Sequence, residues 1–275
     1  MPISPLLMMR QLIVQILILS GLFPTSPGMA QKSSTSPPGY SVVFSDDFRN
    51  LDLSPDGGGA HRWYEGVWFS HHRAPISNIQ SSEDGLKLIW RRGQEQADTS
   101  ISTFSRNAQE VHKWRHGYFE IRMRWTPTRG AWPAVWLIPA SAETLKESGE
   151  MDIFEGNGEH PLDFYGTVHH WVLGGSGKME DRENNGSSNR FIMPRDFDFT
   201  KFHTYGMLWT SDRITWYMDG KELHEERSYG IFSQQEYSLV IGMQEGVGWK
   251  AGNLQGVSAD RMDLDVDWIK VWQKQ

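Results

Sequence analysis

Three acidic side chains, Glu150, Asp152 and Glu155, crowd into a short stretch in the middle of the chain. On an α-helix Glu150 and Asp152 would lie about 200° apart and Glu150 and Glu155 about 140° apart, so no helical face would collect all three. On a β-strand Glu150 and Asp152 share a face because side chains alternate, and Glu155 joins them only if one extra residue is inserted. A β-bulge at Ile153 and Phe154 would insert that residue.

Carboxylates gathered on one strand face suit the hydrolysis of glycosidic bonds. A retaining glycosidase uses two carboxyl groups about 5 to 5.5 Å apart, one as nucleophile and the other first as acid and then as base. Repulsion between the two raises the pKa of one, which keeps a proton beside its ionised partner. Burying such a face in a core would be costly, so we expect it to look into water or a cleft. A plain solvated acidic strand is the alternative interpretation.

The elements around these acids are predicted to be β-strands. From Tyr40 onward, short runs of β-branched and aromatic residues recur between Gly, Asn and Asp clusters, which is typical of antiparallel β-structure. Residues 117–125 (GYFEIRMRW) predict a strand with one apolar and one charged face. Residues 214–223 (ITWYMDGKEL) predict a hairpin that turns at Asp219-Gly220, because glycine accepts a positive φ. In residues 262–268 apolar and acidic side chains alternate, and Trp268 is one of the apolar positions. After Trp268 the apolar residues take the opposite parity, which predicts a strand that ends buried on both faces.

Composition and charge narrow the class of protein. The chain has 275 residues, 38% hydrophobic and 22% charged, which is ordinary for a globular protein and sufficient for one large β domain. Lys+Arg 27 against Asp+Glu 34 gives a net charge of −7, which argues against nucleic acid as a partner. The chain has no cysteine, so neither a disulfide framework nor a lipid-modified cysteine is available. We expect a monomer with one domain over residues 40–275 and no internal repeat.

The amino terminus predicts a secretory signal peptide over residues 1–30. The apolar run Leu12–Phe23 follows Arg10 and precedes a small-residue sequence that ends at Ala30. This run is shorter than the roughly 20 residues of a membrane span, and a retained amino-terminal anchor is the alternative. Residues 31–39 (QKSSTSPPG) predict a flexible linker. We therefore expect a secreted protein, extracellular or periplasmic, without membrane attachment after cleavage.

Several segments resemble glycoside hydrolase family 16, which includes laminarinases, lichenases, β-agarases, porphyranases and κ-carrageenases. Residues 150–155 (EMDIFE), with WPAVW at 132–136 upstream, are similar to the catalytic signature of that family. Similar segments lie at 43–48 (VFSDDF), 117–122 (GYFEIR), 166–170 (GTVHH), 202–209 (FHTYGMLW), 214–221 (ITWYMDGK) and 267–272 (DWIKVW). The resemblance therefore covers nearly the whole chain after the linker.

This resemblance implies a fold and a set of catalytic roles. The implied fold is all-β, a concanavalin-like β-sandwich jelly roll of two curved antiparallel sheets with a concave substrate cleft. Glu150 is implied as the nucleophile, Glu155 as the acid/base, and Asp152 as the residue that tunes the pair, with no cofactor for catalysis. His169 stands where many members place a histidine beside the acid/base, while strand parity turns His170 to the other face.

Sugar-binding side chains are predicted from aromatic residues near the acids, since the flat rings of tryptophan suit the C–H face of a pyranose. Trp132 and Trp136 are four positions apart and share a strand face, where family members stack the donor-side sugar; core packing is the alternative. Asn78 resembles the asparagine that family members place over a donor subsite. Trp171 and Trp249 are weaker candidates of the same kind.

A structural calcium ion is also implied by the resemblance. Many members bind Ca²⁺ on the convex side, through the first strand and the aspartate of the last strand. Those positions are Asp47 and Asp267 here. Oxygen ligands suit calcium, although backbone carbonyls would have to complete the shell.

The resemblance implies a secreted, endo-acting, retaining hydrolase of a β-linked polysaccharide, with a β-1,3-glucan of the laminarin type as the leading substrate. A red-algal galactan hydrolase of the agarase or porphyranase type is the close alternative, because the catalytic motif does not separate the two. A non-catalytic jelly-roll lectin belongs to a different class, but such proteins lose the glutamates that this chain retains. A transglycosylase would share every catalytic residue.

Overall fold

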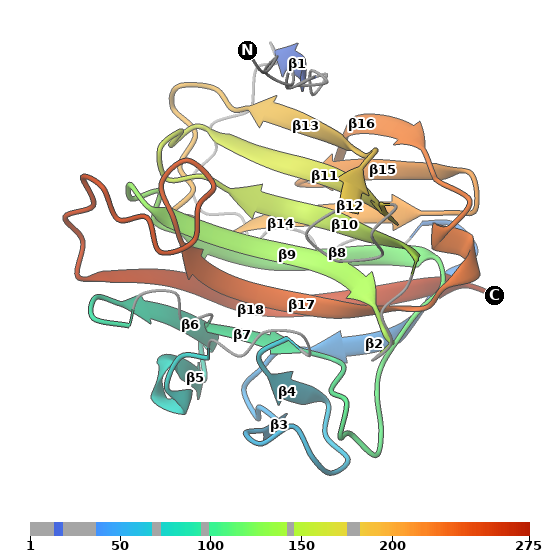
Figure 1. The fold of residues 1–275 in the computed structure, drawn as a ribbon, viewed down its shortest axis with the longest axis horizontal. Helices are drawn as coiled ribbons and strands as arrows, with labels where there is room; N and C mark the ends of the chain where they lie inside the picture. Colours follow the sequence, from blue (N-terminus) through green and yellow to red (C-terminus); the bar gives the residue numbers. More distant parts are fainter. Residues whose placement is uncertain (1–13, 19–36, 68–72, 95–98, 142–145, 175–181) are drawn as a thin grey trace, which may run out of the picture.

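Two β-sheets packed face to face make up the computed structural model, which describes residues 14–18, 37–67, 73–94, 99–141, 146–174 and 182–275 (Figure 1). The helical segments described are two short 3-10 turns, η1 (Ile76–Asn78) and η3 (Phe232–Gln234). Among the described residues, no helix is both long and apolar enough to cross a membrane. The all-β sandwich predicted from the sequence is confirmed.

The larger sheet has ten strands in the order β1-β13-β11-β10-β9-β17-β7-β4-β3, with β12 paired to β11. Its strands are β1 (Val14–Ile18), β3 (Leu53–Ser54), β4 (Trp63–Glu65), β7 (Thr99–Ser102), β9 (Ala131–Pro139), β10 (Glu147–Gly156), β11 (Asp163–Leu173), β12 (Arg182–Asn184), β13 (Ser187–Ile192) and β17 (Tyr237–Glu245). The pairs β1·β13 and β3·β4 are parallel, whereas the central strands pair antiparallel.

The smaller sheet has eight strands in the order β16-β15-β14-β8-β18-β6-β5, with β2 paired to β18. Its strands are β2 (Tyr40–Asp46), β5 (Ile79–Ser82), β6 (Gly85–Arg91), β8 (Gly117–Trp125), β14 (His203–Trp209), β15 (Arg213–Met218), β16 (Lys221–Arg227) and β18 (Arg261–Lys274). The last strand of the chain, β18, thus lies in the middle of this sheet between β8 and β6.

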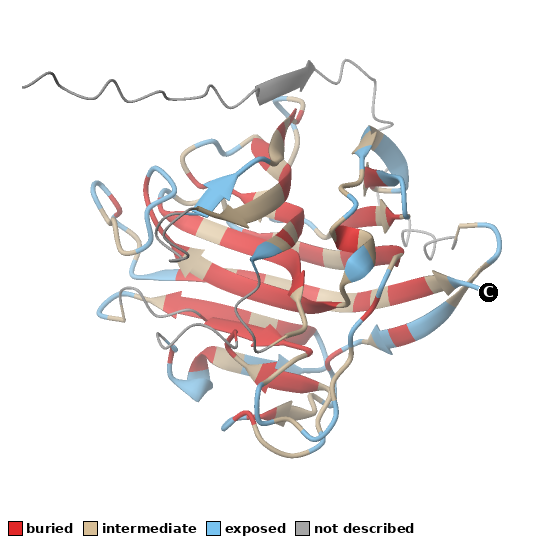
Figure 2. Ribbon diagram, turned by 45° about the vertical axis from the view of Figure 1, so that its right-hand side comes forward, coloured by how far each residue is buried: buried red, intermediate tan, exposed pale blue. Residues whose placement is uncertain are grey.

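The hydrophobic core fills the space between the two sheets (Figure 2). From the larger sheet, Met151, Ile153 and Phe154 of β10 enter it and are almost fully buried. From the smaller sheet, Tyr205 of β14 meets Phe154 with ring centroids 4.5 Å apart. The opposite face of the larger sheet, which we call the site face, points away from the smaller sheet and carries the side chains discussed below.

Two of the strand predictions are confirmed in detail. Strand β8 spans the predicted residues, and its apolar face lies in the core. The hairpin between β15 and β16 turns at Asp219 and Gly220, which both have positive φ (48° and 74°). The charged face of β8 is less solvated than the pattern predicts, because Glu120 is 3% exposed and accepts a hydrogen bond from the hydroxyl of Tyr118 (2.9 Å).

The change of parity near the end of the chain has a local cause. The register between β18 and β8 shifts between Val266 and Trp268, which marks a β-bulge. Trp268 is therefore not part of the core, although simple alternation predicts it there. The amino group of Lys270 lies over its ring (4.7 Å). Ile269 and Val271 take the core positions instead.

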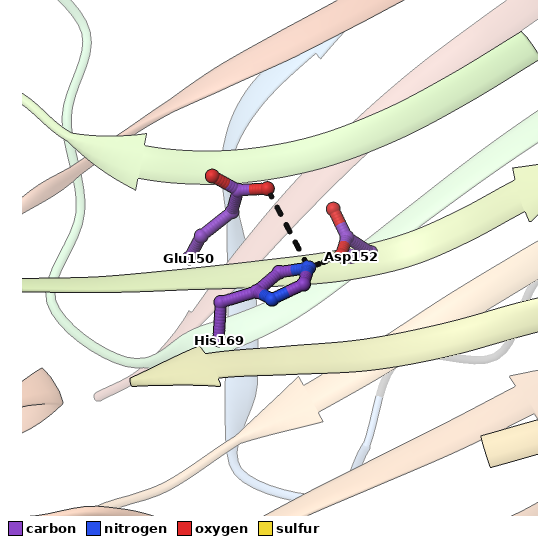
Figure 3. Close-up of side chains that lie close together, drawn as sticks. All are labelled: Glu150, Asp152 and His169. Atoms are coloured by element: carbon purple, nitrogen blue, oxygen red, sulfur yellow. Dashed lines mark ion pairs between the residues drawn. The ribbon is translucent and has the colours of Figure 1, made fainter. Parts of the chain in front are cut away.

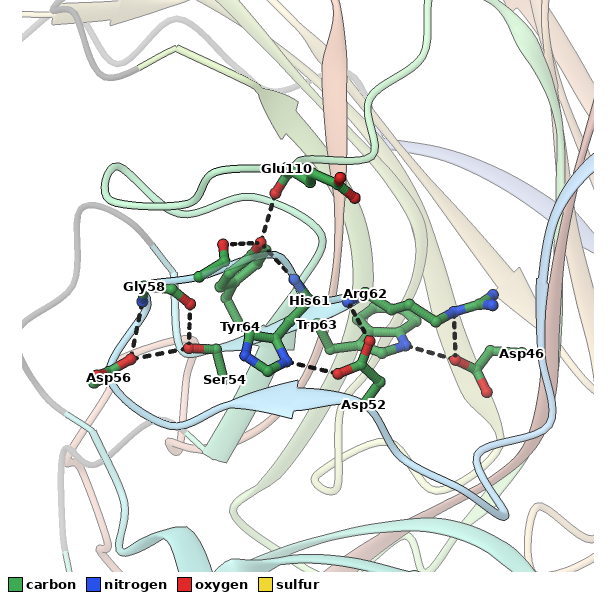
Figure 4. A network of polar contacts seen from close by, with 11 residues as sticks. Asp46, Asp52, Ser54, Asp56, Gly58, His61, Arg62, Trp63, Tyr64 and Glu110 are labelled. Carbon is green, nitrogen blue, oxygen red and sulfur yellow. Dashed lines mark hydrogen bonds and ion pairs between the residues drawn. The ribbon is translucent and has the colours of Figure 1, made fainter.

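A polar network joins the short strands β3 and β4 to the end of β2 (Figure 4). The indole nitrogen of Trp63 donates to Oδ2 of Asp46 (2.9 Å), and Nδ1 of His61 lies 2.6 Å from Oδ1 of Asp52. The hydroxyl of Tyr64 donates to a backbone carbonyl of the loop before β8 (2.5 Å). These bonds fix the edge of the larger sheet together with the burial of Trp63 and Tyr64, whose side chains are fully buried.

Most of the predicted signal peptide and linker lies outside the described residues, since residues 1–13 and 19–36 are among those not described. The segment Val14–Ile18 is described as β1, which pairs in parallel with β13. Secretion and cleavage near residue 30 stay predictions.

Candidate active site

The predicted bulge is present in strand β10. Asp152 pairs with Thr167 of β11 and Glu155 pairs with Tyr165, so Ile153 and Phe154 together oppose the single residue between them on β11. The register with β9 also shifts, between Asp152 and Phe154. Because both bulge residues point into the core, Glu155 returns to the side of the strand occupied by Asp152.

The imidazole of His169 lies over two of the acids on the site face (Figure 3). His169 is the partner of Glu150 in the register of β10 and β11. Its Nε2 is 3.8 Å from Oε1 of Glu150 and 3.4 Å from Oδ2 of Asp152. The structure thus places His169 on the face that strand parity predicts. His170 faces elsewhere, with its Nε2 2.6 Å from Oε1 of Glu147.

Glu155 is held by two donors. The indole nitrogen of Trp132 donates to its Oε1 (3.1 Å), and the hydroxyl of Thr167 donates to its Oε2 (3.3 Å). Burial raises the pKa of Glu155, and the charge of Glu150 adds to this; the charge of His169 and the two hydrogen bonds act in the opposite direction. A carboxyl group with a raised pKa keeps its proton to higher pH, as a general acid requires.

Asp152 is the most buried of the three acids, with 2% of its surface exposed. Burial raises the pKa of Asp152 well above its usual range, and the negative charges of Glu155 and Glu150 raise it further. Burial opposes a charge on His169, but the close approach of Asp152 and the charges of all three acids outweigh it and raise the pKa of His169 to about 9. Asp152, Glu155 and His169 therefore titrate as one interacting set.

An aromatic wall stands beside Glu155. Trp132 meets Trp249 edge to face (5.1 Å between centroids), and Trp249 meets Tyr165 in the same way (5.2 Å). Trp249 is 38% exposed and has a φ of +57°, a conformation that is costly for a residue with a side chain. The backbone N–H of the preceding residue donates to Glu159 (2.5 Å), which holds this turn in place.

Two predicted sugar-binding tryptophans offer less free surface. Trp136 lies on the site face opposite Asp152, but it is 6% exposed and its ring lies over Gly242 of β17. The ring of Trp171 stacks on His169 (4.9 Å, 7° between planes), and the guanidinium of Arg182 lies over Trp171 (4.0 Å). Neighbouring protein groups therefore already cover much of the surface of both rings.

Asn78 is buried and forms its hydrogen bond with a residue other than the three acids. It is 1% exposed, and its Nδ2 donates to Oε1 of Gln94 (2.7 Å). No polar contact joins it to the acids within the part of the chain that the structure describes. Its predicted role over a donor subsite stays a prediction.

Comparison with known proteins identifies the family. Residues 71–270 match the family described as Glycosyl hydrolases family 16. The chain belongs to this family. The resemblance noted from the sequence is therefore confirmed.

Individual family 16 relatives span most of the chain. The beta-glucanase of Rhodothermus marinus is 25% identical over 98% of this chain and 98% of its own length. The endo-1,3-1,4-beta-glycanase ExsH of Rhizobium meliloti is 29% identical over 84% of this chain, which matches about half (51%) of that protein. The kappa-carrageenase of Pseudoalteromonas carrageenovora is 25% identical over 76% of this chain and 58% of its own length.

The fold is also that of solved family 16 structures. SCLam, a non-specific endo-beta-1,3(4)-glucanase, superimposes with a TM-score of 0.64 at 21% identity, covering 88% of this chain and 94% of SCLam. At this level of identity the likeness speaks for the fold, which is the jelly roll predicted from the sequence.

The candidate calcium residues of this family 16 chain surround a guanidinium. Nη1 of Arg49 lies 3.0 Å from Oδ2 of Asp47, Nη2 lies 3.7 Å from Oδ1 of Asp267, and Nε donates to the backbone carbonyl of Glu83 (3.0 Å). Arg122 forms a second ion pair with Asp267. A cation of the protein already lies between the two carboxylates, so this arrangement does not fit a calcium ion.

Sequence reasoning overlooked several residues of the site. Strand parity puts Thr167 on the face of His169, but the hydrogen bond from its hydroxyl to Glu155 was not predicted, and neither was Tyr165, which pairs with Glu155 and whose ring contacts Trp249. Asn184 of β12 lies against the far side of His169, with its Nδ2 2.7 Å from Nδ1. No sequence signal points to Asn184, because its place depends on the pairing of β12 with β11.

Proposed function

We propose that this chain is a secreted, endo-acting hydrolase of a β-linked glucan and that it cleaves with retention of configuration. The observation that carries the proposal is the bulge, which brings Glu150 and Glu155 to one face of β10. The raised pKa of Glu155 supports its role as the acid. The names of the relatives, a beta-glucanase and an endo-1,3-1,4-beta-glycanase, support a β-glucan as substrate.

Each acid takes one role in the proposed reaction. Glu150, whose side chain is 29% exposed, attacks the anomeric carbon while Glu155 gives its proton to the leaving oxygen. Glu155 then removes a proton from the water that hydrolyses the glycosyl-enzyme intermediate. Asp152, which lies close to His169, tunes the electrostatics of the two glutamates and does not bond to the sugar.

The aromatic wall is proposed as the place where a sugar ring stacks beside the acid/base. Trp249 offers exposed ring surface, and Trp132 joins that surface directly to Glu155 through its indole N–H. Trp132 and Trp249 meet edge to face, so a pyranose on one is bordered by the other. Trp136 is almost covered, so it shapes the surface beside the acids and offers little ring area for stacking.

The substrate is tested by incubating the protein with laminarin, mixed-linkage glucan, agarose, porphyran and κ-carrageenan and sizing the products. Mid-sized oligosaccharides from the two glucans are expected. Release from agarose, porphyran or κ-carrageenan alone would move the assignment to the galactan hydrolases, to which the kappa-carrageenase relative gives some weight. Binding without products would indicate a lectin, and products longer than the substrate would indicate a transglycosylase.

The roles of the two glutamates are tested by stereochemistry and rescue. Proton NMR in the first minutes should detect a β-configured product from a β-glycan. Glu150→Gln should abolish turnover with the fold intact. Glu155→Ala should still form the intermediate from an activated aryl β-glycoside, and azide should then release the β-glycosyl azide. An α-configured first product from the wild-type enzyme would refute the arrangement.

A further inference from the structure

One hydrogen bond joins the smaller sheet to the backbone of the catalytic strand. Trp216 of β15 is fully buried in the core, and its indole Nε1 donates to the backbone carbonyl of Asp152 at 2.9 Å. Asp152 belongs to β10 of the larger sheet, so the side chain of Trp216 reaches across the space between the two sheets. Its two ends are 64 positions apart in the chain.

The acceptor of this bond stands at the edge of the bulge. The ladder between β10 and β11 is regular up to Asp152 and resumes at Glu155. A bulge interrupts the regular exchange of backbone hydrogen bonds, and a buried carbonyl left without a partner costs free energy. The indole of Trp216 supplies a donor where the ladder stops, and it comes from outside the sheet.

A glycine opposite the bulge makes room for the indole. Gly166 of β11 is the single residue that faces Ile153 and Phe154. A Cβ atom on Gly166 would overlap the indole nitrogen of Trp216 and would lie 2.6 Å from its Cδ1. The bulge, the missing side chain and the indole therefore form one interlocking unit directly behind the carboxylates.

We propose that Trp216 is a positioning residue for the proposed reaction: its hydrogen bond to Asp152 fixes the bulge and thereby the placement of Glu155 relative to Glu150. The proposal rests on the proposed function, in which those two glutamates react. Trp216 lies on the core side of β10 and does not touch the substrate. Reacting groups must be held closely, because a displacement of about 1 Å can cost a hundredfold in rate.

Other tryptophans of the core provide a matched comparison. Among the described residues, the Nε1 atoms of Trp90, Trp125 and Trp209 are buried without a hydrogen-bond partner. Trp209 is also fully buried and lies on β14, the strand next to β15. Trp209→Phe therefore removes the same atoms as Trp216→Phe without removing a hydrogen bond.

The test compares the two variants for unfolding temperature, kcat and KM. Both should stay folded at the assay temperature, and Trp216→Phe should lose more thermal stability because it leaves the buried carbonyl of Asp152 without a donor. Trp216→Phe should lower kcat on the polysaccharide by about 10- to 100-fold while KM changes little, and Trp209→Phe should leave kcat nearly unchanged. On an aryl β-glycoside with a good leaving group the loss for Trp216→Phe should shrink, because that substrate needs little protonation by Glu155.

A readout without substrate separates this proposal from the proposed function. Carboxyl ¹³C NMR should show changed titration of Asp152 and Glu155 in Trp216→Phe and wild-type titration in Trp209→Phe. Equal loss of kcat in both variants, equal loss on both substrates, or unchanged titration in Trp216→Phe would overturn the positioning role. If the wild-type enzyme cleaves no glycan, the proposed function fails, while the NMR titration still decides whether the bond controls the acids.

Discussion

The side-chain nitrogen of Asn184 lies 2.7 Å from Nδ1 of His169, and the other ring nitrogen faces Glu150 and Asp152. The amide orientation is fixed, because Oδ1 of Asn184 accepts hydrogen bonds from the backbone N–H groups of His170 (3.1 Å) and Gly186 (3.0 Å). An imidazolium would therefore turn its Nδ1–H against another donor. Asn184 favours the neutral ring with its proton on Nε2, whereas the carboxylates favour the charged ring.

Replacing Asn184 by aspartate should raise the pKa of His169. The aspartate accepts a hydrogen bond from Nδ1–H and adds a negative charge, so both effects favour the imidazolium, by about 1 to 3 pH units for a charge at this range. Ring ¹⁵N and ¹³C NMR titration of His169 measures it. Asn185→Asp places the same charge one residue away and should have a smaller effect; equal shifts in both variants would show that Asn184 does not control the ring.

Removing the indole N–H of Trp132 should move the upper limb of the pH profile to higher pH. The bond from Trp132 stabilises the ionised form of Glu155, so Trp132→Phe raises the pKa of that acid. Activity needs protonated Glu155 and falls as pH rises through its pKa, so the limb follows the pKa upward. A hydrogen bond to a charged group contributes about 1.5 kcal/mol, which corresponds to about one pH unit.

The pH profile of kcat/KM measures this shift. Trp249→Phe is the control, because Trp249 contacts the ring of Trp132 and has no hydrogen bond to Glu155 among the described contacts. That variant should bind substrate less well with the upper limb unmoved. A limb that stays in place in Trp132→Phe would exclude Glu155 as the group that sets it.

Calcium should have little effect on the stability of the fold. Arg49 already bridges Asp47 and Asp267, so removing divalent cations with EDTA leaves these carboxylates paired. We expect the unfolding temperature to change by less than about 1 °C with EDTA or with millimolar calcium, because a cation stabilises the fold only if it binds the native state. A rise in unfolding temperature that saturates with calcium would contradict this expectation.

A methyl group at Gly149 should destabilise the protein. Gly149 precedes Glu150 on β10, and a Cβ there would overlap the ring of Phe232 in η3. Gly149→Ala should therefore cost about 1 to 3 kcal/mol, or roughly 2 to 4 °C in unfolding temperature for each kcal/mol. Gly230→Ala is the matched control, because nothing lies within 4 Å of its added Cβ. Equal melting temperatures for the two variants would contradict the close packing behind Gly149.

The parts of the site that follow from local spacing were predictable. Glu150, Asp152 and Glu155 can share a face only on a bulged strand, because the side-chain period of a strand is two. The hairpin at Asp219 and Gly220 follows in the same way from local turn chemistry. In both cases the decisive residues are neighbours in the sequence.

The remaining features depend on contacts between distant segments. Trp132 and Trp136 look equivalent in the sequence, but Trp136 lies over Gly242 of β17. No sequence pattern predicts that β17 pairs with β9. The calcium residues were assigned by resemblance alone. Arg49 stands two positions after Asp47, yet its contact with Asp267 appears only when β2 pairs with β18.

The bulge in β10 decides how the chain would respond to a change in the length of one short segment. If either Ile153 or Phe154 were deleted, the strand would regain regular alternation, and the side chain of Glu155 would stay on the face of Glu150 and Asp152. The core would lose one of the two apolar side chains that now enter it side by side. A three-nucleotide deletion at this point of the coding sequence would therefore leave the acids on one face and would be felt first in the packing beneath them.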